Sequence, residues 1–127
     1  MVARKLKPKP KIYCAGPMSG LPNFNFPAFM AAAEKLREEG WEVYNPAEKD
    51  AEAHLNKKAT KTGDAALAIK HGFDFREAYL WDVTSIIRAD AIYMLPGWEG
   101  SPGARGEHGV ACAMKKHFPH FQIIYGE

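Results

Sequence analysis

Four short, mainly apolar runs divide the chain, and each has the length of a buried β-strand. They cover residues 11–15 (KIYCA), 41–44 (WEVY), 91–95 (AIYML) and 121–125 (FQIIY). A proline follows within two residues of the end of each of the first three runs, which is typical of a strand that stops at a turn. The pattern therefore predicts four strands.

Between these runs, apolar residues recur at helical spacing. A first helix is predicted with Pro27 in its first turn and with Gly40 as its stop, a second over residues 74–89, and a third over residues 101–116. The first helix is predicted to bury Phe29, Ala32, Ala33 and Leu36, and the second Leu80, Val83, Ile86 and Ile87.

Residues 47–73 interrupt this alternation with a polar stretch that has no sustained period. A connection of that length in a small domain predicts a lid or insertion that carries a short helix of its own. The remaining order of strands and helices requires crossover connections, because strand and helix alternate. It predicts a single small α/β domain, Rossmann-like or flavodoxin-like, with a parallel sheet of four to five strands and helices on both faces.

Composition and charge narrow the class of protein. The chain has 127 residues, 46% of them hydrophobic, which suits one folded domain, and its apolar runs are too short for a membrane span. Residues 1–10 are predicted to form a flexible basic tail, and residues 11–127 the domain. The formal net charge is +2, but residues 12–127 carry twelve basic against fifteen acidic residues. This slightly acidic body favours a small-molecule ligand over a nucleic-acid polymer.

The cysteines and the N-terminus suggest a cytoplasmic protein. Cys14 and Cys112 both lie in apolar stretches without metal-ligand spacing, so we expect two reduced thiols in the core. The basic stretch at the start is not followed by the apolar run of a secretory signal.

The loops that follow the strands are the predicted ligand surface, because parallel α/β sheets bind ligands beyond the carboxyl ends of their strands. Glycine-rich turns that lead into a helix offer backbone N–H groups to an anion. An ordinary turn is the alternative for each of these loops. The predicted binding residues are Gly16, Pro17, Met18, Ser19, Gly20, Asn45, Gly97, Ser101 and Gly103.

Two acidic residues and one tyrosine are candidates for chemistry. Glu107 lies among small residues early in the third predicted helix, and Asp82 lies at the edge of the apolar stripe of the second. Two carboxyl groups in different environments suit cleavage of a glycosidic bond, with one as nucleophile and the other handling a proton. Tyr13 is the third residue of the first strand and close to its carboxyl end. Solvated acids and a core tyrosine are the alternatives.

The residues quoted next carry a resemblance to a known superfamily. Segments 12–20 (IYCAGPMSG), 82–90 (DVTSIIRAD) and 101–111 (SPGARGEHGVA) resemble, in this order, the nucleoside 2-deoxyribosyltransferase superfamily, and more narrowly its short DUF4406 branch. The resemblance implies that Glu107 attacks the anomeric carbon of a 2-deoxyribosyl group, that Asp82 protonates the leaving base, and that Tyr13 orients Glu107. No metal or other cofactor is implied.

The resemblance also bears on substrate and assembly. Superfamily members that act on free nucleosides carry an acid six residues before the nucleophile, whereas Ser101 occupies that position here, as in the branch that hydrolyses deoxynucleoside 5′-monophosphates. We therefore expect a nucleoside or, in preference, a 5′-monophosphate as substrate, and a homodimer or larger homo-oligomer. Two alternatives are a catalytically silent nucleotide-binding module and a flavodoxin-like redox domain, the latter disfavoured because no flavin-phosphate loop follows the first strand.

Overall fold

A four-stranded, all-parallel sheet forms the centre of the protein. The computed structural model describes residues 8–53 and 55–127, so most of the predicted basic tail, residues 1–7, lies outside the described residues. The strands are β1 (Lys11–Ala15), β2 (Glu42–Tyr44), β3 (Ala91–Met94) and β4 (Gln122–Tyr125), in the spatial order β2-β1-β3-β4. All four strands agree with the apolar runs of the sequence, and the predicted α/β class is confirmed.

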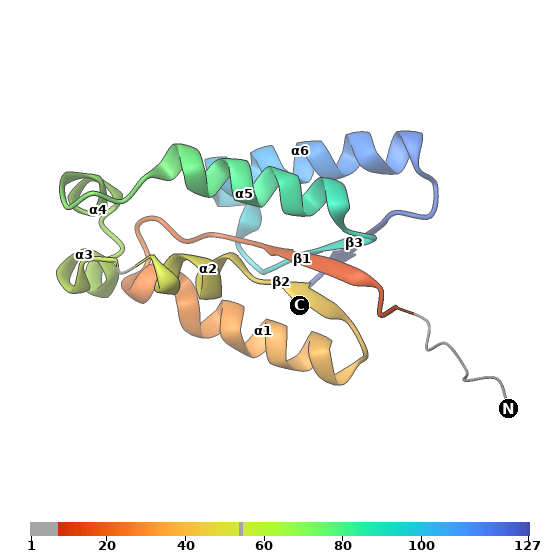
Figure 1. Ribbon diagram of the computed structural model, residues 1–127, viewed down its shortest axis with the longest axis horizontal. Coiled ribbons are helices and arrows are strands. Elements are labelled where there is room, and N and C mark those ends of the chain that lie inside the picture. The colour runs from red at the N-terminus through yellow and green to blue at the C-terminus, as the bar shows by residue number, and fades with distance from the viewer. Residues whose placement is uncertain (1–7, 54) are drawn as a thin grey trace, which may run out of the picture.

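Helices cover both faces of the sheet, as predicted, with α1 and α2 on one side and α5 and α6 on the other (Figure 1). Capping explains where these helices begin: the Asp74 side chain accepts hydrogen bonds from the first turn of α5, and the Ser101 side chain does so for α6. The helices are α1 (Phe26–Glu38), α2 (Pro46–Glu52), α3 (Lys57–Thr62), α4 (Ala65–Lys70), α5 (Phe75–Arg88) and α6 (Pro102–His117).

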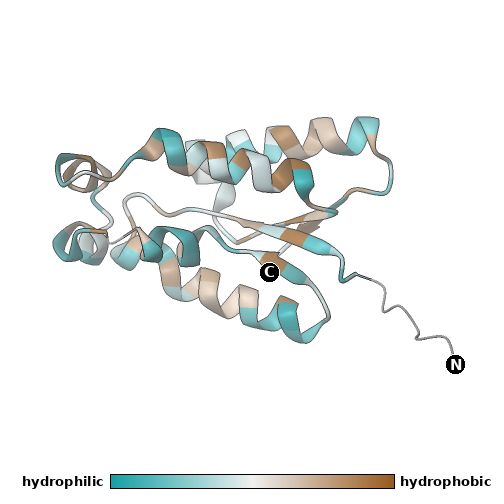
Figure 2. Ribbon diagram, in the orientation of Figure 1, coloured by the Kyte–Doolittle hydropathy of each residue, from teal (hydrophilic) through white to brown (hydrophobic). Residues whose placement is uncertain are grey.

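The strand pleat separates two apolar clusters, one on each face of the sheet. In β1, Tyr13 and Ala15 pack with α5 and α6, whereas Ile12 and Cys14 pack with α1. Phe29 and Leu36 of α1 are buried against the second of these clusters. The last turns of α1 are mainly hydrophilic in Figure 2, and their Glu, Lys and Arg side chains are exposed. Among the described residues, no helix combines the length and the apolar character that crossing a membrane requires.

Two predictions about burial were wrong. In α5, Leu80 and Ile87 are 69% and 55% exposed, and the buried positions are Ser85 and Ile86. The face that packs against the sheet and α6 is narrower than the apolar stripe in the sequence, so two of the four predicted core residues lie outside it. Cys14 is buried as expected, but Cys112 is exposed on the outer side of α6.

The polar stretch over residues 47–73 holds three short helices, α2, α3 and α4, rather than one. The α3–α4 pair packs on Phe24, which is buried with Ala59 and Ala68 in a third, separate cluster. Phe24 lies in the 3-10 helix η1 (Pro22–Asn25), three of whose residues have positive φ values. The backbone N–H of Gly20 donates to the carbonyl of Gly63 at 2.7 Å, which ties this insertion to the loop after β1.

Candidate active site

A cavity of about 640 Å³ opens at the carboxyl ends of the strands. After β1 the chain crosses to β2 on one side of it, and β3 lies on the other side, so β1 and β3 flank the point where the strand order reverses. The loop after β1, the loop after β3, and parts of α2, α5 and α6 line the cavity. This is the place at which parallel α/β sheets bind small molecules.

Tyr13 contacts Glu107, one of the residues that line this cavity. The Tyr13 hydroxyl donates a hydrogen bond to Oε2 of Glu107. Tyr13 is fully buried on the α5–α6 side of β1, whereas Glu107 lines the cavity from the second turn of α6. The N-cap bond of Ser101 Oγ with the N–H of Ala104, at 3.2 Å, fixes the start of the helix that carries Glu107.

Asp82 reaches the same cavity from the middle of α5. Burial and, next, the nearby Asp50 carboxylate raise the pKa of Asp82 to about 7, against the neighbouring Tyr13 hydroxyl, which lowers it. Burial likewise raises the pKa of Glu107 to about 8, with the charge of Asp82 as the next cause. Because Asp82 and Glu107 are neighbours in a desolvated cavity, sharing one proton is more favourable for them than ionising together.

Burial also raises the pKa of Tyr13 well above its ordinary range, followed by the charges of Glu107 and Asp82. Tyr13 therefore stays protonated and acts as a hydrogen-bond donor at neutral pH. Since an O–H donor stabilises the ionised form of an acceptor carboxyl, its contact with Glu107 favours the Glu107 carboxylate. The predicted triad of Tyr13, Asp82 and Glu107 is thus brought together in space.

Asp50 is a third carboxyl group in the cavity, and the sequence analysis missed it. It projects from α2, which packs against α5, and lines the cavity together with Asp82. Burial raises the pKa of Asp50 to about 6, while the charge of Lys49 opposes the shift. The sequence around Asp50 is polar and aperiodic, so only the packing of α2 reveals that this side chain faces a cavity.

The predicted loop residues divide into two groups. Gly16, where an added Cβ would lie 2.7 Å from Cβ of Leu95, must be glycine for the first loop to pass this closely over the second. The exposed Gly20 has a positive φ of 87° and does not line the cavity. The predicted loop residues that line the cavity are Gly16, Pro17, Met18, Ser19, Gly97, Ser101 and Gly103.

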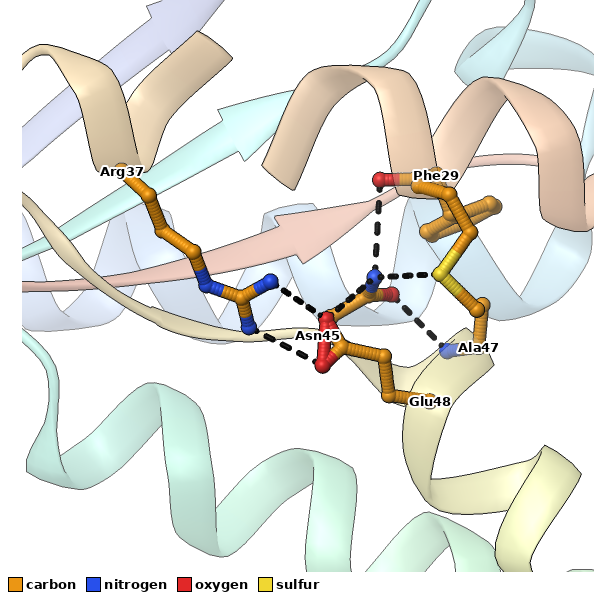
Figure 3. Close-up of polar contacts among 6 residues, drawn as sticks. Phe29, Arg37, Asn45, Ala47 and Glu48 are labelled. Atoms are coloured by element: carbon orange, nitrogen blue, oxygen red, sulfur yellow. Dashed lines mark hydrogen bonds and ion pairs between the residues drawn. The ribbon is translucent and has the colours of Figure 1, made fainter. Parts of the chain in front are cut away.

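Asn45 lies at the carboxyl end of β2, as predicted, but its side chain serves the fold. Its Oδ1 accepts a hydrogen bond from the N–H of Ala47 at 2.9 Å and so caps α2 (Figure 3). Its Nδ2 donates to the carbonyl of Phe29 and to Oε1 of Glu48, which is also paired with Arg37. Asn45 is only 3% exposed and is absent from the cavity lining, so the prediction that it contacts a ligand receives no support from its placement.

The residues available to a cofactor or metal are few. Within residues 8–53 and 55–127, no group of three or more His, Cys, Asp and Glu side chains is arranged to hold a metal ion. What the cavity does offer is carboxyl groups on one wall and the start of a 16-residue helix on another. Such a helix start presents backbone N–H groups that favour an anion.

Comparison with known proteins gives one family. No curated protein shows a significant match to this sequence. The family model described as "Domain of unknown function (DUF4406)" matches residues 10–119, a range that contains the three catalytic candidates, the loops after β1 and β3, and Asp50. The chain belongs to the DUF4406 family.

Proposed function

We propose that the protein cleaves the N-glycosidic bond of a 2′-deoxynucleoside 5′-monophosphate and passes the sugar to water or to a second base. The observation that carries this proposal is the contact between Tyr13 and Glu107, made in a cavity that Asp82 also lines. A carboxylate nucleophile, a group that orients it and a carboxylic acid with a raised pKa are the parts that glycosidic cleavage by double displacement requires.

The reaction has two displacements. In the first, a Glu107 oxygen bonds to the anomeric carbon while the carbon–nitrogen bond breaks, and the bonding electrons leave with the base. Asp82 gives its proton to that base, which departs neutral. In the second, water or another base attacks the anomeric carbon and breaks the ester to Glu107, and Asp82 recovers a proton from the attacking group.

The protonation of the cavity suits this sequence near neutral pH. With pKa values raised to about 7 for Asp82 and about 8 for Glu107, the two groups together hold one proton between these values. The pKa of Glu107 is the higher of the two, so this proton resides mainly on Glu107; the reactive form is the less populated arrangement, with the proton on Asp82 and Glu107 ionised. The hydrogen bond from Tyr13 favours this form, because it stabilises negative charge on Glu107.

A phosphate fits the wall formed by the start of α6. Ser101 and Gly103 line the cavity there. Pro102 has no N–H, and the N–H groups of Ala104 and Arg105 bond to Ser101, so the N–H of Gly103 is the one in this turn that remains for a phosphate oxygen. A serine hydroxyl donates a hydrogen bond to a phosphate, whereas a carboxylate at this position would repel it. This arrangement supports a 5′-monophosphate in preference to a free nucleoside. Since such nucleotides are metabolites of the cytoplasm, the proposal also places the protein there.

A homo-oligomer is also part of the proposal. Tyr79, Leu80 and Ile87 are each more than half exposed on α5, and Tyr79 also lines the cavity. A second copy that covers this surface would bury apolar area and close one side of the cavity. Light scattering coupled to gel filtration tests this: a monomer at concentrations of about 100 μM, far above most homodimer dissociation constants, contradicts it.

The test of the function is release of free base. The full chain is incubated with each of the four common deoxynucleosides and its 5′-monophosphate, with and without an added base, and the mixture is separated by chromatography. Glu107→Gln keeps the side chain's shape and serves as the matched inactive variant. Release of base by the wild type and not by this variant supports the proposal; equal release by both contradicts it. Binding of a nucleotide without any release would instead identify a silent binding module.

A further inference from the structure

The cavity has two chemically different walls. The start of α6, with Ser101 and Gly103, is the wall that suits a phosphate. Asp50 of α2 and Asp82 of α5 contribute carboxyl groups from other elements, beside the aromatic side chains of Phe75 and Tyr79. If the phosphate lies at α6 and the anomeric carbon at Glu107, the base extends toward α2 and α5, where flat aromatic surfaces can contact its faces.

Asp50 stands out on this second wall. Besides the main cavity, it lines a small apolar recess with Phe24, Phe73 and Phe75. The hydrogen bonds and ion pairs among the described residues include none to the Asp50 carboxylate, which faces the cavity. The nearby Lys49 is exposed at the surface. The Asp50 carboxylate is half-buried and faces the cavity, so a ligand that displaces water from it has to supply a hydrogen-bond donor in its place.

We infer that Asp50 is a specificity-determining residue that selects a base carrying an exocyclic amino group, with adenine as the best match. The inference rests on the proposed function. In adenine, the ring nitrogen N7 and the amino group on C6 lie side by side. Asp82, in its protonated form, donates to N7, and Asp50, in its ionised form, accepts a hydrogen bond from the amino group. Asp82 then supplies the proton that the leaving base needs, while Asp50 distinguishes this base from others.

The same geometry rejects a base with an oxo group at that position. Hypoxanthine has the same ring size and the same N7 as adenine, but its C6 carries a carbonyl oxygen. That oxygen would face the Asp50 carboxylate, so that two acceptors would meet and neither would have a donor. A site that leaves buried polar groups unpaired discriminates strongly against such an analogue.

The experiment compares base release from 2′-deoxyadenosine and 2′-deoxyinosine 5′-monophosphates by the wild-type protein, at a pH of about 7.5 where Asp50 is ionised. We expect kcat/KM to be at least about tenfold higher for the adenine nucleotide. In Asp50→Asn, whose amide can donate to an oxo group as well as accept from an amino group, the ratio is expected to fall to about one. Asp50→Ser, which also removes the charge, is expected to lose the preference too.

Glu52→Gln is the matched control, because Glu52 is exposed on the same helix and this substitution also removes one negative charge. This variant should keep the wild-type ratio of kcat/KM for the two nucleotides. A wild-type ratio near one overturns the inference, whatever the variants do, and so does a ratio that survives both Asp50 substitutions. Cleavage of other nucleotides without this preference overturns only the role of Asp50. No release of base from any nucleotide overturns the proposed function, and the inference with it.

Discussion

The Tyr13 hydroxyl donates a hydrogen bond to the carboxylate of Glu107, a residue 94 positions later in the chain. Tyr13 lies on a central strand and Glu107 on a helix that packs over the same face of the sheet. Their contact therefore depends on the whole α/β crossover between them and on no local feature of either segment. In the proposed reaction it orients the nucleophile and lowers the pKa of Glu107, which favours the ionised form.

Removing this hydrogen bond should slow the reaction without unfolding the protein. Tyr13→Phe preserves the buried ring and deletes only the hydroxyl. A hydrogen bond to a carboxylate contributes roughly 1.5 to 3 kcal/mol, so we expect kcat for base release to fall by roughly 10- to 100-fold. The control is Tyr125→Phe, which deletes the hydroxyl bonded to His108 at 2.8 Å outside the cavity. Equal losses in the two variants would contradict the assigned role of Tyr13.

The pH dependence of base release should be bell-shaped, with its maximum between about pH 7 and 8. Below this interval a second proton binds the Asp82–Glu107 pair and blocks the nucleophile; above it the pair loses the proton that the leaving base requires. The measurement is kcat/KM from pH 5 to 10. Tyr13→Phe should move the acid limb to higher pH, because the hydrogen bond lowers the pKa of Glu107. Full activity down to pH 5 would show that the pKa of Glu107 is not raised.

Glu107 should destabilise the folded protein at alkaline pH. Its pKa rises from the ordinary value of 4.5 to about 8 on folding, so the folded chain holds one more proton than the unfolded chain between these values. The stability that Glu107 contributes is therefore complete below about pH 4.5 and is lost as the pH rises toward 8. We expect Glu107→Gln to raise the free energy of unfolding on the order of 2 kcal/mol at pH 9 and to change it little at pH 5.

Urea denaturation at the two pH values measures this difference. Glu99→Gln, at an exposed position in the loop after β3, is the matched control and should show no such pH dependence. A gain in stability of equal size at both pH values would point to a packing effect of glutamine instead of the titration of Glu107.

Ser101 should decide between phosphorylated and free substrates. Ser101→Asp retains a good helix N-cap but places a negative charge beside the proposed phosphate position. We expect kcat/KM for the 5′-monophosphate to fall by about 100-fold or more, because the aspartate carboxylate and the neighbouring phosphate would repel each other strongly. Cleavage of the free nucleoside should change far less. Ser101→Thr keeps a hydroxyl and should retain the wild-type ratio of the two substrates; loss of both activities in Ser101→Asp would contradict the phosphate assignment.

Gly63 should be the most sensitive glycine of the insertion. It has a φ of 71°, and an added Cβ would lie 2.0 Å from the carbonyl oxygen of Leu21. We expect Gly63→Ala to lower the free energy of unfolding by about 3 kcal/mol, through backbone strain together with displacement of the η1 segment. Gly72→Ala tests the strain alone, since Gly72 has a φ of 94° and no atom near the added Cβ, and should cost about 1 kcal/mol. Equal losses in urea denaturation would exclude the steric contact with Leu21.

The sheet and the helix starts could be predicted because each is marked by a pattern of neighbouring residues in the sequence. Each strand is an apolar run closed by a turn, and Asp74 and Ser101 mark helix starts by side-chain capping that depends only on neighbouring residues. The outward placement of Leu80 and Ile87 could not be predicted in this way. Which part of an apolar stripe is covered depends on where the neighbouring helix crosses, and that angle is absent from the local pattern.

Only part of the candidate site could be predicted from the sequence. Loops that follow parallel strands share one edge of the sheet, so the residues after β1 and β3 converge as expected. Asn45 obeys the same rule in position, but its amide caps α2 and binds a backbone carbonyl. Asp50 reaches the cavity through the docking of a short helix within an aperiodic stretch. Both cases depend on side-chain direction, which strand order does not determine.

The alternation along β1 also has a consequence for engineering. Tyr13 and Ala15 face the layer of α5 and α6, while Ile12 and Cys14 face α1. Substitutions at positions 12 and 14 should therefore tune thermal stability with little effect on ligand chemistry, whereas those at position 13 should affect both, because Tyr13 is fully buried and contacts Glu107. A single residue inserted before Tyr13 would exchange the two faces and turn the tyrosine away from Glu107, even if every residue of the strand remained.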